Sequence, residues 1–169
     1  MAIENIKTFD QFIETVARKY KNRTALKIRP RFRTISWSYE DLFKYSNLVA
    51  QLLEKRKIKK GDKVLLWAPN SPLWVASFFG IQLKGAIVVP INFQNTADFV
   101  KKILKQTKSK LIIKSNHLPV IRNVKTLIID DIFSPTNFKF KLSRTNVKEN
   151  DVAEIIYTSG TTGFPKGVI

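Results

Sequence analysis

Residues 152–168 read VAEIIYTSGTTGFPKGV and join an apolar run to a loop rich in glycine and hydroxyl side chains. The run from Val152 to Tyr157 has the length and composition of a buried strand. In open α/β sheets, ligands bind beyond the carboxyl ends of the strands, so a strand followed by such a loop predicts a ligand site. The residues that could contact a ligand there are Thr158, Ser159, Gly160, Thr161, Thr162, Gly163 and Lys166.

The chemistry of this loop suits the oxygens of a polyphosphate. Glycine lets backbone N–H groups converge on a small negative group, because it adopts tight or left-handed conformations without steric cost. The hydroxyl groups can donate to phosphate or bind its magnesium, and Lys166 adds a mobile positive charge. Each hydrogen bond to a charged oxygen contributes about 1.5–3 kcal/mol, so a handful could hold a triphosphate. An ordinary surface turn rich in Ser, Thr and Gly is the structural alternative.

The loop does not fit the P-loop of nucleotide hydrolases and kinases. That pattern requires a glycine, four residues of any type, and then Gly-Lys-Ser/Thr. Counted from Gly160, the position of the second glycine holds Pro165, and Lys166 is followed by Gly167. The spacing therefore excludes the P-loop.

Three further stretches belong with the loop: residues 34–42 read TISWSYEDL, residues 68–75 APNSPLWV and residues 82–92 QLKGAIVVPIN. In the same order, these stretches and the loop resemble signature segments of the adenylate-forming superfamily, which includes acyl-CoA synthetases, luciferases and nonribosomal peptide adenylation domains. The resemblance spans roughly residues 8–169, and residues 151–156 are most similar to fatty acyl-CoA synthetases. Residues 93–99 depart from the pattern, because this segment is shorter than in the superfamily. Within it, Asp98 stands where an acid is expected.

The resemblance implies a function. In the superfamily, the loop holds the β- and γ-phosphates of ATP while a substrate carboxylate attacks the α-phosphate, and pyrophosphate leaves. The acyl group then passes to coenzyme A. The resemblance thus implies ATP, Mg²⁺ and coenzyme A as cofactors, and a small-molecule carboxylic acid, expected to be a fatty acid, as substrate. It gives the role of phosphate contact to Thr158, Ser159, Gly160, Thr161, Thr162, Gly163 and Lys166.

The resemblance also implies a domain organisation. Family members are several times longer, so residues 1–169 are expected to form the incomplete N-terminal part of the AMP-binding domain, ending in the phosphate loop and the start of the next strand. The catalytic residues are expected beyond Ile169, and this stretch alone is expected to be inactive. A cytoplasmic protein with peripheral membrane contact is expected. The alternatives are a non-catalytic nucleotide- or partner-binding module of the same fold and a basic nucleic-acid-binding domain.

Composition limits these alternatives. The net charge of +17 favours anionic partners, but the basic residues are spread along the chain. The densest run, residues 55–60, falls at a predicted helix end, where cations favour the helix dipole. No zinc-finger spacing or aromatic RNA-binding motif accompanies it, so a nucleic-acid partner is not expected. The chain has no cysteine and one histidine, His117, which excludes thiolate or histidine metal clusters.

Residues 64–83 form a run of 20 residues without charge, the length of a membrane span. Pro69 and Pro72 interrupt the run, which favours a strand, a turn and a buried helix instead.

Hydrophobic periodicity predicts alternating helices and strands. The first helix is expected to start with a capping box formed by Thr8 and Gln11. Trp37, Trp67 and Trp74 are expected in the core. The fold class is α/β, with a mostly parallel sheet covered by helices. Helices are expected over 9–20, from Ser38 to about residue 53, 73–83 and 97–106; strands over 25–29, 33–37, 63–67, 86–89, 110–113, 124–129 and 152–157; and a loop over 130–150.

Overall fold

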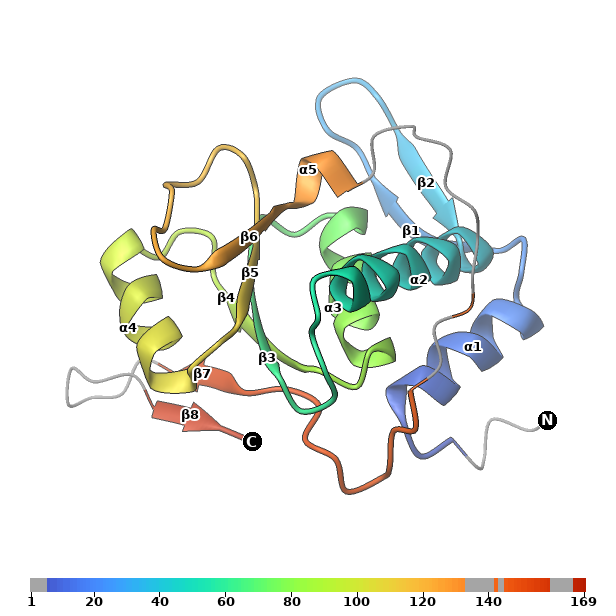
Figure 1. The fold of residues 1–169 in the computed structure, drawn as a ribbon. Coiled ribbons are helices and arrows are strands. Elements are labelled where there is room, and N and C mark those ends of the chain that lie inside the picture. The colour runs from blue at the N-terminus through green and yellow to red at the C-terminus, as the bar shows by residue number, and fades with distance from the viewer. Residues whose placement is uncertain (1–5, 133–141, 143–144, 159–165) are drawn as a thin grey trace.

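The computed structural model describes residues 6–132, 142, 145–158 and 166–169. Its centre is a sheet of four parallel strands in the order β4-β3-β5-β6 (Figure 1). In register, Val64 of β3 lies between Val88 of β4 and Leu111 of β5. The predicted parallel α/β sheet is confirmed. The strands are β3 (Lys63–Trp67), β4 (Ile87–Ile91), β5 (Leu111–Lys114) and β6 (Lys125–Ile128).

Helices cover both faces of this sheet. Alternate residues of β3 point to opposite faces, so Val64 and Leu66 belong to one apolar cluster and Leu65 and Trp67 to another. The first cluster packs under α2 (Tyr39–Lys55) and α3 (Pro72–Leu83), and the second under α4 (Ala97–Thr107). Continuous burial along β3 is typical of a parallel strand enclosed by helices.

A third layer contains the N-terminal elements. Helix α1 (Phe9–Lys19) packs against α2 and α3, and the antiparallel hairpin of β1 (Thr24–Ile28) and β2 (Ile35–Ser38) lies beside α2 (Figure 1). Their shared apolar cluster includes Ile13, Leu42 and Ala76. Trp67 is fully buried, as expected, whereas Trp37 and Trp74 are half-buried at the edges of the core clusters.

Helices α1 and α2 begin in different ways. At α2, the Ser38 hydroxyl accepts the Asp41 backbone N–H and the Asp41 carboxylate accepts the Ser38 backbone N–H, which makes a complete capping box. The predicted box at α1 is wrong. The Gln11 amide oxygen instead accepts the backbone N–H of Lys7, 3.0 Å away, and the Thr8 hydroxyl makes no capping bond.

The segment after β6 also departs from expectation. The predicted loop 130–150 begins as a short helix, α5 (Ile129–Ile132), because Ile129 and Ile132 are buried in the cluster beneath α2 and α3. The Asp130 carboxylate accepts the Asn116 backbone N–H at 2.9 Å, which ties α5 to the loop after β5. The rest of the predicted loop lies partly outside the described residues.

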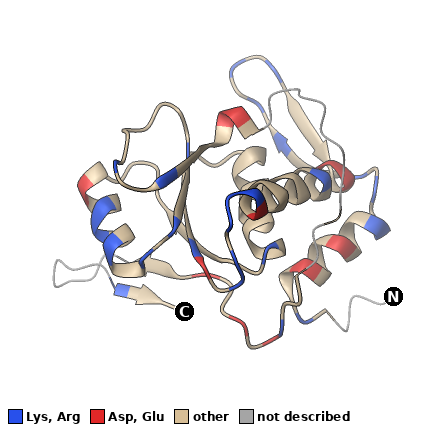
Figure 2. Cartoon of the chain, viewed as in Figure 1, with Lys and Arg blue, Asp and Glu red and all other residues tan. Residues whose placement is uncertain are grey.

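Lysine and arginine residues are scattered over several helices and connecting loops (Figure 2). The predicted interruption of residues 64–83 is confirmed, since they divide into β3, a turn and α3. Within the part of the chain that the structure describes, none of the helices is long and apolar enough to cross a membrane. His117 is exposed in the loop after β5.

Helices α2 and α3 approach so closely that Gly80 admits no side chain. A Cβ built at Gly80 would lie 2.5 Å from the Val49 Cβ and 2.7 Å from the Ser46 carbonyl oxygen. We expect Gly80→Ala to destabilise the α2–α3 contact by about 1–2 kcal/mol, because overpacking outweighs the better helix propensity of alanine. Hydrogen exchange of α2 and α3 peptides measures the loss. Ser77→Ala, one turn earlier, adds no atom and is the control; equal protection in both variants would contradict the expectation.

Candidate functional site

The chain reaches the candidate site along the free edge of β4. The Val88 backbone N–H donates to the Ala153 carbonyl at 3.0 Å, and the Ile155 N–H donates to the Val88 carbonyl at 2.9 Å. Glu154 thus forms a parallel bridge with Val88. The segment before the glycine-rich loop is therefore docked next to the sheet, as a fifth parallel neighbour of short extent.

The loop joins two strands that pair with each other. Strand β7 (Ile156–Thr158) is antiparallel to β8 (Lys166–Val168), and Thr158 lies directly opposite Lys166. The predicted strand 152–157 is therefore shorter than expected and begins at Ile156, because residues 153–155 bond to β4 only at an isolated bridge. The following strand, expected at the end of this region, begins at Lys166.

Tyr157 anchors this hairpin. Tyr157 packs against the cluster beneath α4, and β7 contacts both β4 and β8 (Figure 1). Gly167 permits this arrangement, because a Cβ there would lie 3.1 Å from the Tyr157 Cζ and 3.1 Å from the Ile155 Cγ2. Burial raises the pKa of the Tyr157 phenol above its usual value, so the side chain is neutral at pH 7.

Of the seven predicted site residues, Thr158 and Lys166 are described, and the structure places them across from each other at the base of the loop. Ser159, Gly160, Thr161, Thr162 and Gly163 lie outside the described residues. Lys166 is exposed, and within the described part of the chain its ammonium enters no ion pair. A positive charge is thus available where the loop begins and ends.

A polar hollow of about 350 Å³ opens at the carboxyl ends of β3 and β4. This is the edge of an α/β sheet at which ligands bind. Its polar side chains were not singled out from the sequence, although Asn70 and Asn92 lie in two of the quoted segments. The Asn92 side-chain oxygen accepts the Gln94 backbone N–H at 3.0 Å, which fixes its orientation. The lining residues are Ala68, Asn70, Trp74, Pro90, Ile91, Asn92, Phe93 and Gln94.

A buried lysine supports the same edge of the sheet, and sequence reasoning missed it. The Lys114 ammonium, at the end of β5, donates to the carbonyls of Ser115 and Leu118 at 2.8 Å each. Burial lowers the pKa of Lys114, although the nearby Asp130 carboxylate opposes the shift. In the sequence, a lysine after an apolar run indicates only a strand end. Its two carbonyl contacts close the loop after β5.

Among the described residues, no three His, Cys, Asp or Glu side chains come together in a way that could hold a metal ion. Magnesium prefers oxygen ligands and is commonly bound through phosphate oxygens with one or two protein groups. The hydroxyl side chains of Thr158, Ser159, Thr161 and Thr162 are oxygen donors of the kind that could take part in such a site.

Known proteins resemble this chain along nearly its whole length. The family described as AMP-binding enzyme matches residues 13–169. Two curated relatives are 4-coumarate–CoA ligase 1 of Petroselinum crispum, 33% identical over 79% of this chain and 27% of its own, and crotonobetaine/carnitine–CoA ligase of Escherichia coli, 30% identical over 94% and 35%. The chain therefore spans about a quarter to a third of their length.

A solved structure shows the same fold. The fatty acyl-adenylate ligase from L. pneumophila, in complex with acyl adenylate and pyrophosphate, superposes with a TM-score of 0.85 at 22% identity. The match covers 98% of this chain and 30% of that chain. The two chains share the arrangement of helices and strands.

Proposed function

The chain belongs to the AMP-binding enzyme family, and we propose that residues 1–169 form the N-terminal part of the AMP-binding domain of an ATP-dependent, AMP-forming acyl-CoA synthetase. The observation that carries the proposal is the pairing of Thr158 with Lys166 at the base of the glycine-rich loop. This pairing brings Thr158, the first hydroxyl residue of the loop, opposite Lys166, whose ammonium enters no ion pair among the described residues. Hydroxyl groups and lysine ammonium groups both bind phosphate oxygens.

The proposed reaction has two steps. A carboxylate oxygen of the substrate attacks the α-phosphorus of ATP, the bond to the β-phosphate oxygen breaks, and pyrophosphate leaves. The thiol of coenzyme A then attacks the acyl carbon and displaces AMP. Mg²⁺, when bound, neutralises part of the phosphate charge.

The role of this chain is to hold the departing pyrophosphate. Backbone N–H groups at Gly160 and Gly163 and the hydroxyls of Thr158, Ser159, Thr161 and Thr162 would donate to the β- and γ-phosphate oxygens. Lys166 would compensate charge that grows on the leaving group as the bond to the α-phosphorus breaks. The bridge between Glu154 and Val88 supports this role, because it fixes the start of the hairpin to the sheet.

The proposed substrate is a fatty acid. The support is the similarity of residues 151–156 to fatty acyl-CoA synthetases, together with a fold like that of a fatty acyl-adenylate ligase. The two curated relatives are named for 4-coumarate and for crotonobetaine and carnitine. These acids are therefore the competing candidates.

Pyrophosphate exchange into ATP by the full-length protein tests the proposal. We expect exchange that depends on an added carboxylic acid, with palmitate or decanoate several-fold better than 4-coumarate or carnitine at equal concentration. Preference for 4-coumarate would overturn the fatty-acid assignment and leave the reaction type intact. Exchange with none of a broad panel of aliphatic, aromatic and amino acids would favour a non-catalytic nucleotide-binding module.

A further inference from the structure

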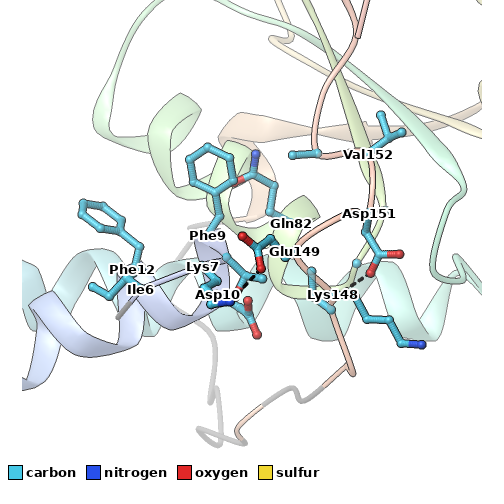
Figure 3. A pocket seen from close by; sticks show the side chains of 15 residues that line it. Ile6, Lys7, Phe9, Asp10, Phe12, Gln82, Lys148, Glu149, Asp151 and Val152 are labelled. Atoms are coloured by element: carbon cyan, nitrogen blue, oxygen red, sulfur yellow. Dashed lines mark hydrogen bonds and ion pairs between the residues drawn. The ribbon is translucent and has the colours of Figure 1, made fainter. Parts of the chain in front are cut away.

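A second cavity of about 350 Å³ lies between the start of α1, the end of α3 and residues 147–153 (Figure 3). Gly85 and Ala86, which line it, directly precede β4. The cavity therefore lies at the amino end of that strand, whereas the polar hollow described above lies at its carboxyl end. Its volume falls within the range of small-molecule sites.

The Gln82 side chain, in the last turn of α3, makes this cavity unusual. Gln82 is only 5% exposed and lines the cavity, yet neither its amide nitrogen nor its amide oxygen has a hydrogen-bond partner among the described residues. A buried polar group without a partner costs about 1–3 kcal/mol. A ligand that offers one acceptor and one donor side by side would satisfy both atoms.

Two residues at the start of α1 that line the cavity each carry a further buried oxygen without a partner among the described residues. These oxygens are the Thr8 hydroxyl oxygen and one carboxylate oxygen of Asp10. Two acidic groups at the rim are paired: Glu149 with Lys7 at 2.9 Å, and Asp151 with Lys60. Lys148 also lines the cavity, and its ammonium enters no ion pair among the described residues. The Lys60 ammonium and the Lys148 backbone N–H hold the pKa of Asp151 below its usual value, so that pair persists at pH 7. Among the described residues the Asp10 carboxylate also enters no ion pair, so a negative group placed directly beside it is disfavoured.

The remaining lining is apolar and partly aromatic. Phe9 and Phe12 of α1 lie along the cavity, and both rings are more than a third exposed. Figure 3 shows Phe9 and Gln82 coming from the two helices, with Val152 on the third side. Exposed phenylalanine rings that also pack on Phe79 of α3 form a preformed apolar wall for a flat ring.

We propose that this cavity binds a small, neutral aromatic carboxamide. The amide group of such a ligand pairs with the Gln82 amide, donor to acceptor and acceptor to donor, while a second N–H faces the Asp10 carboxylate. The aromatic ring lies against Phe9 and Phe12. A carboxylate ligand is rejected, because it brings no N–H donor and adds a second negative charge beside Asp10.

Ligand-detected NMR titration of the full-length protein with benzamide tests this site. The titration is done with ATP and Mg²⁺ in excess, so that a nucleotide pocket cannot account for binding. We expect saturable binding of benzamide, and affinities about tenfold lower for benzoate and for N,N-dimethylbenzamide, which lacks the N–H donors. No saturable binding, or equal affinity for the three compounds, would refute the proposal whatever the outcome of the pyrophosphate exchange.

Two variants and a control locate the binding. Gln82→Leu removes both amide atoms and Gln82→Glu keeps the shape but removes the donor, and each is expected to weaken benzamide binding about tenfold. Ser77→Ala is the matched control, because the Ser77 hydroxyl on α3 is also buried and has no partner in the described part of the chain, but Ser77 does not line the cavity. Unchanged affinity in the Gln82 variants, or an equal loss in Ser77→Ala, would place the ligand elsewhere.

Discussion

Replacing Trp67 with alanine is expected to destabilise the central sheet by about 3–5 kcal/mol. The Trp67 side chain is fully buried at the end of β3, where its backbone lies between Ile91 of β4 and Lys114 of β5. Its ring fills the apolar cluster beneath α4, together with Val100 and Ile103. Truncation leaves a cavity that the surrounding strands cannot close, because each of them is held by its own ladder of hydrogen bonds.

The matched control is Trp67→Phe. The indole N–H of Trp67 has no hydrogen-bond partner among the described residues, so its removal forfeits no bond. We expect this variant to lose no more than about 1.5 kcal/mol, since it keeps most of the apolar volume. Hydrogen exchange of peptides from β3, β4 and β5 in the full-length protein compares the two. A phenylalanine variant as unstable as the alanine variant would show that the indole makes a polar contact that the structure lacks.

The sheet could be predicted because each of its strands is marked by residues that lie close together in the sequence. Runs such as residues 63–67 and 110–113 are short, apolar and followed by turn residues, and the helix between β3 and β4 implied a parallel crossover. The start of α2 was predictable for the same reason, since Ser38 and Asp41 stand only three residues apart. The start of α1 was not, because Gln11 can reach two backbone N–H groups and the residues alone do not decide between Lys7 and Thr8.

The site could be predicted only in part. Residue types and their order pointed to the loop after Tyr157, but the pairing of Thr158 with Lys166 depends on hairpin register, which three-residue strands do not reveal. Lys114 and Gln82 gave no signal at all. Both side chains are buried. Lys114 has hydrogen-bond partners, whereas the Gln82 amide has none among the described residues. Burial and hydrogen bonding depend on the tertiary structure, so the sequence alone did not indicate either residue.

The largest effect on activity is expected from Lys166→Ala. If the Lys166 ammonium holds the outer phosphates of ATP, its loss removes a charged hydrogen bond and lowers kcat/KM for ATP by about 10- to 100-fold. Pyrophosphate exchange by the full-length protein measures this. Lys166→Arg keeps the charge in a different shape and should recover part of the loss, because arginine binds phosphate oxygens through a wider, planar group.

Lys105→Ala separates direct contact from the general field of a chain with a net charge of +17. Lys105 is exposed on α4 and its removal changes the net charge equally. Raising the salt concentration screens the general field between exposed charges, while a contact made through a hydrogen bond persists. Lys166→Ala should therefore retain most of its deficit at high salt, and Lys105→Ala should show little deficit at any salt concentration. An equal, salt-sensitive loss in both variants would mean that the general positive charge of the chain, and not a direct contact, attracts ATP. The assignment of the phosphate contact to Lys166 would then fail.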